Sequence, residues 1–127
     1  MSEVLNEKPK YDLEERTAKF GETIINFVKT LKITPINRRI IDQLVGSYGS
    51  VGANYCEATK AESKKDFIHK IGISKKEIKE TKHWLRLFGI SDKEYKVGID
   101  KIMKEAHELL LIFSKIKRTA SERKIDN

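Results

Sequence analysis

The sequence of 127 residues has one cysteine, two prolines and one tryptophan, and it contains no long apolar run. The single cysteine, Cys56, excludes an internal disulfide framework and is typical of a protein from a reducing compartment. No uncharged apolar stretch approaches the roughly 18 residues of a membrane span, and residues 1–10 lack the apolar core of a signal peptide. We therefore expect a cytoplasmic protein that makes no contact with a membrane.

The sequence is rich in charge of both signs, with an excess of bases. Lys and Arg number 26 against 19 Asp and Glu, which gives a net charge of +7, and charged residues make up 35% of the chain. This length fits one domain and is sufficient to bury a core without a metal or disulfide. The scarcity of proline and the abundance of charge together favour helices.

Apolar or small residues recur at alternating steps of three and four, which keeps them on one face of a helix. The pattern predicts a first helix that begins at Asp12 and stops at Thr34-Pro35, because proline disfavours helical geometry in the residue before it. A second helix is predicted from about Asn37 to Ala61, with few charges and two adjacent apolar or small stripes.

Capping signals delimit a third and a fourth helix. Ser63 stands three residues before an acidic side chain, and Ser91 with Glu94 matches the S-x-x-E capping box. Gly89 has the residue type that most often follows a helix C-terminus. We therefore expect the third helix to end at Gly89 and the fourth to begin at Ser91.

Four segments of similar length joined by short connections favour antiparallel neighbours. The sequence thus predicts an all-α protein, an up-down-up-down antiparallel four-helix bundle over residues 12–117. We expect residues 1–11 to form a flexible N-terminal segment. The polar residues 118–127 are expected to form a disordered basic tail.

The second helix contains three interior glycines at a spacing of three. Each costs a helix about 1 kcal/mol relative to alanine, so the row needs a compensating contact. Small residues let another backbone approach closely, either in a tight crossing inside the monomer, or at a subunit interface, or both. The positions assigned to this contact are Gly46, Tyr48, Gly49, Gly52, Ala53 and Tyr55.

The excess positive charge is concentrated in residues 60–86, which hold nine bases and four acids. A row of bases at helical spacing can meet successive phosphates and bind nucleic acid without sequence preference. The same row is also consistent with a solvated face or with an acidic protein partner. Trp84 favours core or subunit packing over base stacking. The bases assigned to nucleic-acid binding are Lys65, Lys75, Lys79, Lys82 and Arg86.

The sequence offers no catalytic constellation, so we expect a protein that is not an enzyme and that uses no cofactor or metal. Glu80-x-x-His83 matches one di-iron half-motif, but those sites need two such motifs facing inward and His83 is predicted on the outer face. His69 and His107 have no ligand-spaced partner. Cys56 has no nearby histidine to activate it and is predicted to be a buried small hydrophobe.

The run Ser50-Val51-Gly52-Ala53-Asn54-Tyr55-Cys56-Glu57 resembles the signature S-[IV]-G-A-N-[IV]-A-E-G of the 23S rRNA intervening-sequence proteins. Within it Ser50, Asn54 and Glu57 are assigned as a buried polar motif, with Asn54 either setting helix register or pairing with Ser50 or Glu57.

The resemblance implies an antiparallel four-helix bundle that assembles as a ring-shaped homopentamer, with no enzymatic activity. The family is also similar to the accessory proteins of diversity-generating retroelements, whose basic pentamers bind nucleic acid and a reverse transcriptase. Two functions are therefore carried forward. One is a basic oligomer that binds nucleic acid, such as structured or rRNA-related RNA. The other is a structural or adaptor oligomer that docks a protein partner such as a reverse transcriptase.

Overall fold

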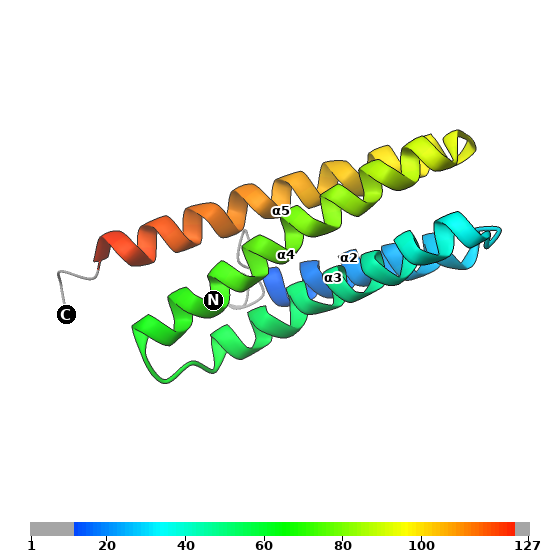
Figure 1. The fold of residues 1–127 in the computed structure, drawn as a ribbon. Coiled ribbons are helices and arrows are strands. Elements are labelled where there is room, and N and C mark those ends of the chain that lie inside the picture. The colour runs from blue at the N-terminus through cyan, green and yellow to red at the C-terminus, as the bar shows by residue number, and fades with distance from the viewer. Residues whose placement is uncertain (1–11, 124–127) are drawn as a thin grey trace, which may run out of the picture.

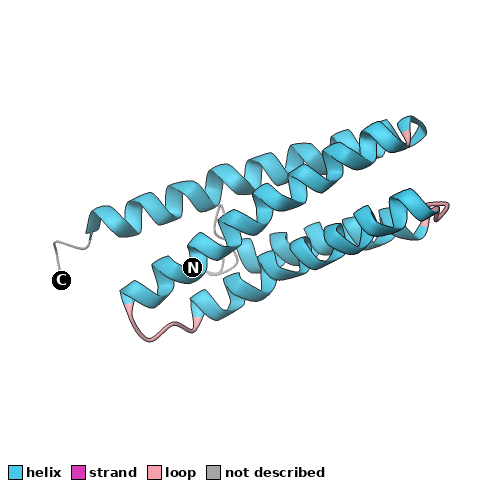
Figure 2. Ribbon diagram, in the orientation of Figure 1, coloured by secondary structure: helices cyan, strands magenta, loops and turns pink. Residues whose placement is uncertain are grey.

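A computed structural model describes residues 12–123, which form four long helices. They are α2 (Leu13–Lys29), α3 (Pro35–Thr59), α4 (Lys64–Ser91) and α5 (Lys96–Glu122), with a short 3-10 helix η1 (Lys93–Tyr95) before α5. No strand occurs among the residues described (Figure 2). The prediction of an all-α four-helix bundle is confirmed.

The two ends of the bundle are formed by different connections. The α2–α3 and α4–α5 connections lie together at one end, and the α3–α4 connection lies at the other (Figure 1). Helix α3 packs most extensively against α4, α4 packs against α5, and the contact between α2 and α5 is the smallest of the four. Helix α4 therefore lies diagonally across the bundle from α2, with α3 and α5 as the neighbours of both.

The core consists of the predicted apolar stripes. Leu13, Phe20 and Ile24 of α2 are buried, and the stripes of the other helices meet them in one cluster. Their burial follows from the spacing of three and four, because only one face of each helix turns inward. The largest fully buried side chains of the other helices are Leu44, Ile71, Ile78, Leu85, Phe88, Leu109 and Phe113.

Helix starts are fixed by side-chain caps, two of which match the prediction. Asp12 accepts a hydrogen bond from the backbone N–H of Glu15, and Ser63 accepts one from Asp66. Thr34 differs from its predicted role, because it begins α3 and does not terminate the first helix, which ends at Lys29.

Thr34 and Asn37 form a reciprocal capping box at the start of α3. The Thr34 hydroxyl accepts from the backbone N–H of Asn37 at 3.1 Å, and the Asn37 side chain accepts from the Thr34 N–H at 2.7 Å. Pro35 occupies the first helical turn, where a missing N–H costs nothing. Asn37 is fully buried and also donates to Asp92 at 3.1 Å, so this cap joins the α2–α3 connection to the α4–α5 connection.

The predicted boundary between the third and fourth helices is wrong. Helix α4 continues through Gly89 to Ser91, and no glycine in residues 12–123 has a positive φ. Ser91 does not cap the next helix, since its hydroxyl donates to the carbonyl of Phe88 at 3.2 Å within α4. Asp92 ends α4, held by the hydrogen bond from Asn37, which no local sequence signal encodes.

The predicted disordered tail is wrong for residues 118–122, which extend α5 to Glu122. The apolar spacing continues there, since Thr119 and Ala120 follow Ile112 and Ile116 by seven and four positions and line a cavity with Phe67. This packing supports the last turns of the helix. Residues 1–11 and 124–127, where the other predicted tails fall, lie outside the described residues.

Candidate nucleic-acid interface

The basic row of α4 faces α5. The Lys82 ammonium donates a hydrogen bond to Nδ1 of His107 on α5 at 3.1 Å, which fixes the direction in which this side of α4 points. Lys75, Lys79 and Arg86 stand seven and three positions before Lys82 and four after it, so they share that side. Four of the five predicted bases thus follow the outer groove between α4 and α5, which we call the α4–α5 groove.

Three acids of these two helices, Glu77, Glu80 and Glu105, point elsewhere. Glu77 and Glu80 lie five and two positions before Lys82, turned by more than a third of a helical turn away from it. Burial raises the pKa of the Glu77 carboxyl, and the negative charge of Glu80 raises it further. On α5, Glu105 is bound by Arg16 of α2 and faces that helix. Positive charge is therefore segregated into the α4–α5 groove.

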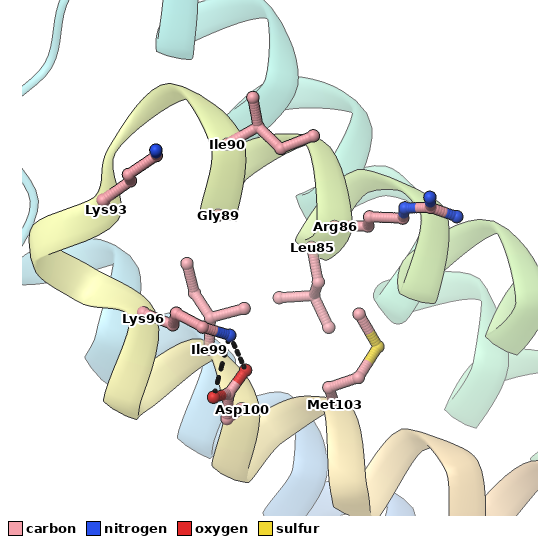
Figure 3. Close-up of a pocket in the computed structure, with 9 residues that line it drawn as sticks. All are labelled: Leu85, Arg86, Gly89, Ile90, Lys93, Lys96, Ile99, Asp100 and Met103. Atoms are coloured by element: carbon pink, nitrogen blue, oxygen red, sulfur yellow. Dashed lines mark hydrogen bonds and ion pairs between the residues drawn. The ribbon is translucent and has the colours of Figure 1, made fainter.

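A cavity of about 490 Å³ opens at the end of the groove nearest the α4–α5 connection (Figure 3). Its interior is apolar and its rim is basic. The rim includes Arg86 and Lys93, together with Lys96, which donates to Asp100 at 3.1 Å. The remaining residues that line it are Leu85, Gly89, Ile90, Ile99 and Met103.

A second basic cavity of about 510 Å³ lies nearer the start of α4. Lys65 lines it, so this fifth predicted base lies off the row but beside another cationic cluster. Lys76, His69 and Lys117 line the same cavity. The Lys117 ammonium lies so near Gly72 that a Cβ added there would stand 3.3 Å from it.

The sequence prediction did not include Lys93 and Lys96, which line the first cavity, or Lys117, which lines the second. Their place depends on how α5 lies against α4, which the spacing within one helix does not specify. The concentration of bases in residues 60–86 was the available signal, and it identified only the α4 side.

The glycine row of α3 lies away from the α4–α5 groove, beside small and apolar residues of α2 and α3. Among residues 12–123, a Cβ added at Gly46 or Gly49 would meet nothing within 4 Å, and one added at Gly52 would make only ordinary contact, 3.7 Å from Thr17. A tight crossing within the monomer is therefore wrong at Gly46 and Gly49. The close approach to α3 occurs instead at Gly21 of α2, which the buried ring of Tyr48 contacts.

Exposed apolar side chains lie beside these open glycines, together with Glu14 and Glu22 of α2. Ile25 of α2 is 47% exposed and Val45 of α3 is 40% exposed. Ala53 is exposed, whereas Tyr55 is half-buried with its ring edge-on to Phe113 at 5.7 Å. A shallow cavity between α2 and α3 runs through this surface, which we call the α2–α3 face.

The family model of the 23S rRNA-intervening sequence proteins matches residues 10–115 of this chain. The chain belongs to that family. A crystal structure from Bacteroides thetaiotaomicron, of a protein with unknown function from the S23 ribosomal protein family, is similar to it with a TM-score of 0.72. The two are 29% identical, and the match covers 82% of this chain and 96% of that chain. No curated protein matches.

In this 23S rRNA-intervening sequence protein the motif residues of α3 are not a buried polar cluster, which corrects the prediction. Ser50 and Asn54 are half-buried, and Glu57 is exposed. The Asn54 side chain donates to the backbone carbonyl of Ser50 at 2.9 Å, within its own helix. Glu57 instead pairs with Lys70 of α4 at 2.7 Å, which lowers the pKa of the Glu57 carboxyl.

The buried polar contacts between α3 and α4 are made by small hydroxyl residues. Ser74 of α4 donates to the carbonyl of Val51 at 3.0 Å, and the hydroxyls of Thr81 and Ser47 lie 3.0 Å apart. All three are buried. The helical spacing of Ser47, Ser74 and Thr81 is consistent with the core face of α3 and α4. Which of them pair across the two helices is seen only in the tertiary structure.

Cys56, Trp84 and His83 differ in burial. Cys56 is exposed, so its prediction as a buried hydrophobe is wrong. Cys56 lies on α3 between the buried residues Val51 and Ala58, but its side chain is on the outer face of the helix. Trp84 is half-buried against the core, as predicted, and His83 is exposed with its ring edge-on to Trp84. Within residues 12–123, none of the helices is both long and apolar enough to cross a membrane.

Proposed function

We propose that this protein is a non-enzymatic, basic homo-oligomer of antiparallel four-helix bundles that binds nucleic acid, in particular structured RNA, through the α4–α5 groove. The observation that supports it is the segregation of charge. Lys75, Lys79, Lys82 and Arg86 follow one groove. Glu77, Glu80 and Glu105 point away from it, and Asp100 at its end is paired with Lys96.

The physical basis is release of counterions from the phosphate backbone. A row of four bases at successive steps of four, three and four presents one charge about every 4.5 to 6 Å along the helix, given its rise of about 1.5 Å per residue. Such a row displaces condensed cations, so affinity falls steeply with salt and depends little on sequence. Several copies in one oligomer multiply the effect, because a second contact on the same strand becomes intramolecular.

Binding is measured by fluorescence anisotropy with a labelled structured RNA over a salt series. Replacing Lys75, Lys79, Lys82 and Arg86 with Glu is expected to abolish binding at low salt and to leave the oligomer intact. The matched control replaces four exposed bases outside the groove, Lys29, Arg38, Arg39 and Lys60, with Glu. Absence of RNA binding by the unmodified protein at low salt would overturn the proposal, as would equal losses in the two variants.

The proposed assembly is a homopentamer in which the α2–α3 face forms the subunit interface. Gly46 and Gly49 are helix-destabilising residues that no other helix of the same chain approaches, so a contact from another subunit accounts for their presence. Ile25 and Val45 supply exposed apolar surface beside them. Native mass spectrometry at micromolar concentration tests the assembly, and a monomer would overturn it.

A second candidate function is that of an adaptor that docks a protein partner such as a reverse transcriptase. One observation favours it. Large apolar side chains are exposed in and beside the α2–α3 and α4–α5 connections, which share one end of the bundle (Figure 1). These are Ile33, Ile36, Ile90 and Val97. An oligomer that binds no RNA at low salt but loses a protein partner when Ile36 becomes Asp would support this function.

A further inference from the structure

The cavity at the end of the α4–α5 groove has two chemically distinct parts. Leu85, Ile99 and Met103 point toward its middle, as Figure 3 shows, and Ile90 stands at its side, so the four form an apolar floor. Leu85 and Ile99 are buried, and the accessible surface of this floor comes from half-buried Met103 and exposed Ile90. Arg86 and Lys93 stand at its edge. Arg86 also ends the basic row of the groove, so the row leads directly to the cavity.

The polar chemistry inside the cavity is sparse. Asp100 is the acid that lines it, and both of its carboxylate oxygens accept from Lys96, at 3.2 and 3.1 Å. The Lys96 ammonium therefore neutralises the carboxylate of Asp100. A ligand that fits must therefore bring an apolar surface to the floor and negative charge to the rim.

A nucleotide within a single strand has both properties, because a flat base is attached to a backbone of phosphates. A duplex presents only the phosphates, since its bases are stacked and paired and must be flipped out to reach a pocket. A peptide made only of acidic residues also brings charge, but it offers no flat apolar group to the floor.

We propose that this cavity holds one unstacked base of a single-stranded nucleic-acid segment whose phosphates lie along the basic row that ends at Arg86. The inference rests on the proposed nucleic-acid binding and deepens it by naming the ligand as unpaired strand. Met103 and Ile90, which cover buried Leu85 and Ile99, contact the base through apolar surface, so recognition is independent of base identity.

The test compares three probes of equal length by fluorescence anisotropy: a single-stranded RNA, the same RNA in a duplex, and a single-stranded abasic sugar-phosphate strand. The abasic strand keeps every phosphate and lacks every base. The single-stranded RNA is expected to bind about tenfold more tightly than the abasic strand, because only a strand with bases brings an apolar group to the floor. Equal affinities would overturn the inference while leaving the proposed function intact.

Variants separate the floor from the general charge. Ile90→Ser and Met103→Ser are expected to weaken binding of the single-stranded RNA and to leave the affinity for the abasic strand unchanged. The matched control is Ile36→Ser, because Ile36 and Ile90 are similarly exposed, at 72% and 66%, and Ile36 does not line the cavity. Circular dichroism verifies that each variant folds.

Two further outcomes are decisive. If none of the three probes binds at low salt, the proposed function fails and the inference fails with it. If poly-glutamate of the same charge competes as well as the single-stranded RNA, the cavity recognises acidic chains in general and the base-binding inference is wrong.

Discussion

The guanidinium of Arg16 binds both carboxylate oxygens of Glu105, with its Nε 2.7 Å from Oε2 and its Nη2 2.9 Å from Oε1. Nη2 also donates to Glu108 at 2.8 Å. These contacts join α2 to α5, the neighbouring helices that otherwise touch least. Glu105 raises the pKa of the Arg16 guanidinium, chiefly through the hydrogen bond. The pairing also holds two acids of α5 away from the α4–α5 groove.

Arg16→Met is expected to lower the free energy of unfolding by about 1 kcal/mol, because a partly exposed bidentate pair lies at the upper end of surface ion pairs. Urea denaturation measures it. The control is Lys96→Met, which removes an exposed i,i+4 pair with Asp100 and is expected to cost at most about 0.5 kcal/mol. Equal losses of unfolding free energy in the two variants would show that the Arg16 contacts between α2 and α5 stabilise the fold no more than an exposed ion pair within one helix.

Two glycines predict opposite effects of alanine. Gly89→Ala is expected to stabilise the fold by about 0.5 to 1 kcal/mol, since the new Cβ would make only ordinary contact with Ile99 at 3.9 Å and helix propensity improves. At Gly98 the Cβ would stand 3.1 Å from the ring of Phe27.

The Phe27 ring has little room to move, because it packs edge-on against Phe88 and Tyr95 with centroids 6.0 and 6.1 Å away. Gly98→Ala is therefore expected to destabilise the protein despite the better helix propensity. Thermal unfolding of the two variants, side by side, measures the sign of each effect. A stabilised Gly98→Ala variant would show that this aromatic cluster yields easily.

Gly49→Leu is expected to dissociate the proposed oligomer and to leave the helical content unchanged, because a Cβ at exposed Gly49 would meet no atom of residues 12–123 within 4 Å. Analytical ultracentrifugation measures the mass, and circular dichroism measures the helix content. Thr23→Leu serves as control, since exposed Thr23 lies seven residues after Arg16, on the side of α2 that faces α5. An intact oligomer in the Gly49→Leu variant would remove Gly49 from the interface.

The pair of Glu57 and Lys70 predicts a pH-dependent link between α3 and α4. The hydrogen bond from Lys70 lowers the pKa of Glu57 below its ordinary value, so the stabilisation from this carboxylate is present above the ordinary pKa and is lost as pH falls through the lowered one. Lys70→Met is expected to return the Glu57 pKa toward its ordinary value. A titration of the Glu57 side-chain carbon by NMR measures it, and an unchanged pKa would contradict the pairing.

Much of the fold was predictable because helix periodicity and two of the caps are local. The stripes that include Phe20 and Leu44, and the N-caps Asp12 and Ser63, all have their predicted roles. The helix boundary at Ser91 was not predictable. A capping-box pattern is present in the sequence, but the buried Asn37 of the neighbouring helix α3 donates to Asp92, and α4 ends there.

The candidate site was predictable only in part. Periodicity placed four bases of α4 on one face, and the structure shows that this face lines the groove with α5. Lys96 and Lys117 line the two basic cavities beside α4, and their place there depends on how α5 packs against α4. In the motif of α3, Glu57 pairs outward with another helix and does not turn inward, a partner that residue spacing within α3 does not indicate.

The sequence by itself determined the net charge of +7 and the excess of bases in residues 60–86. It also determined the four helices and their buried stripes. Those features depend on residues three or four positions apart, which a helix always brings together. The tertiary structure decided which face of α4 meets α5, and it left Gly46 and Gly49 open to solvent. Both outcomes depend on how whole helices rotate and pack against one another, because a helix can present any of its faces to a neighbour until the core of the bundle fixes one.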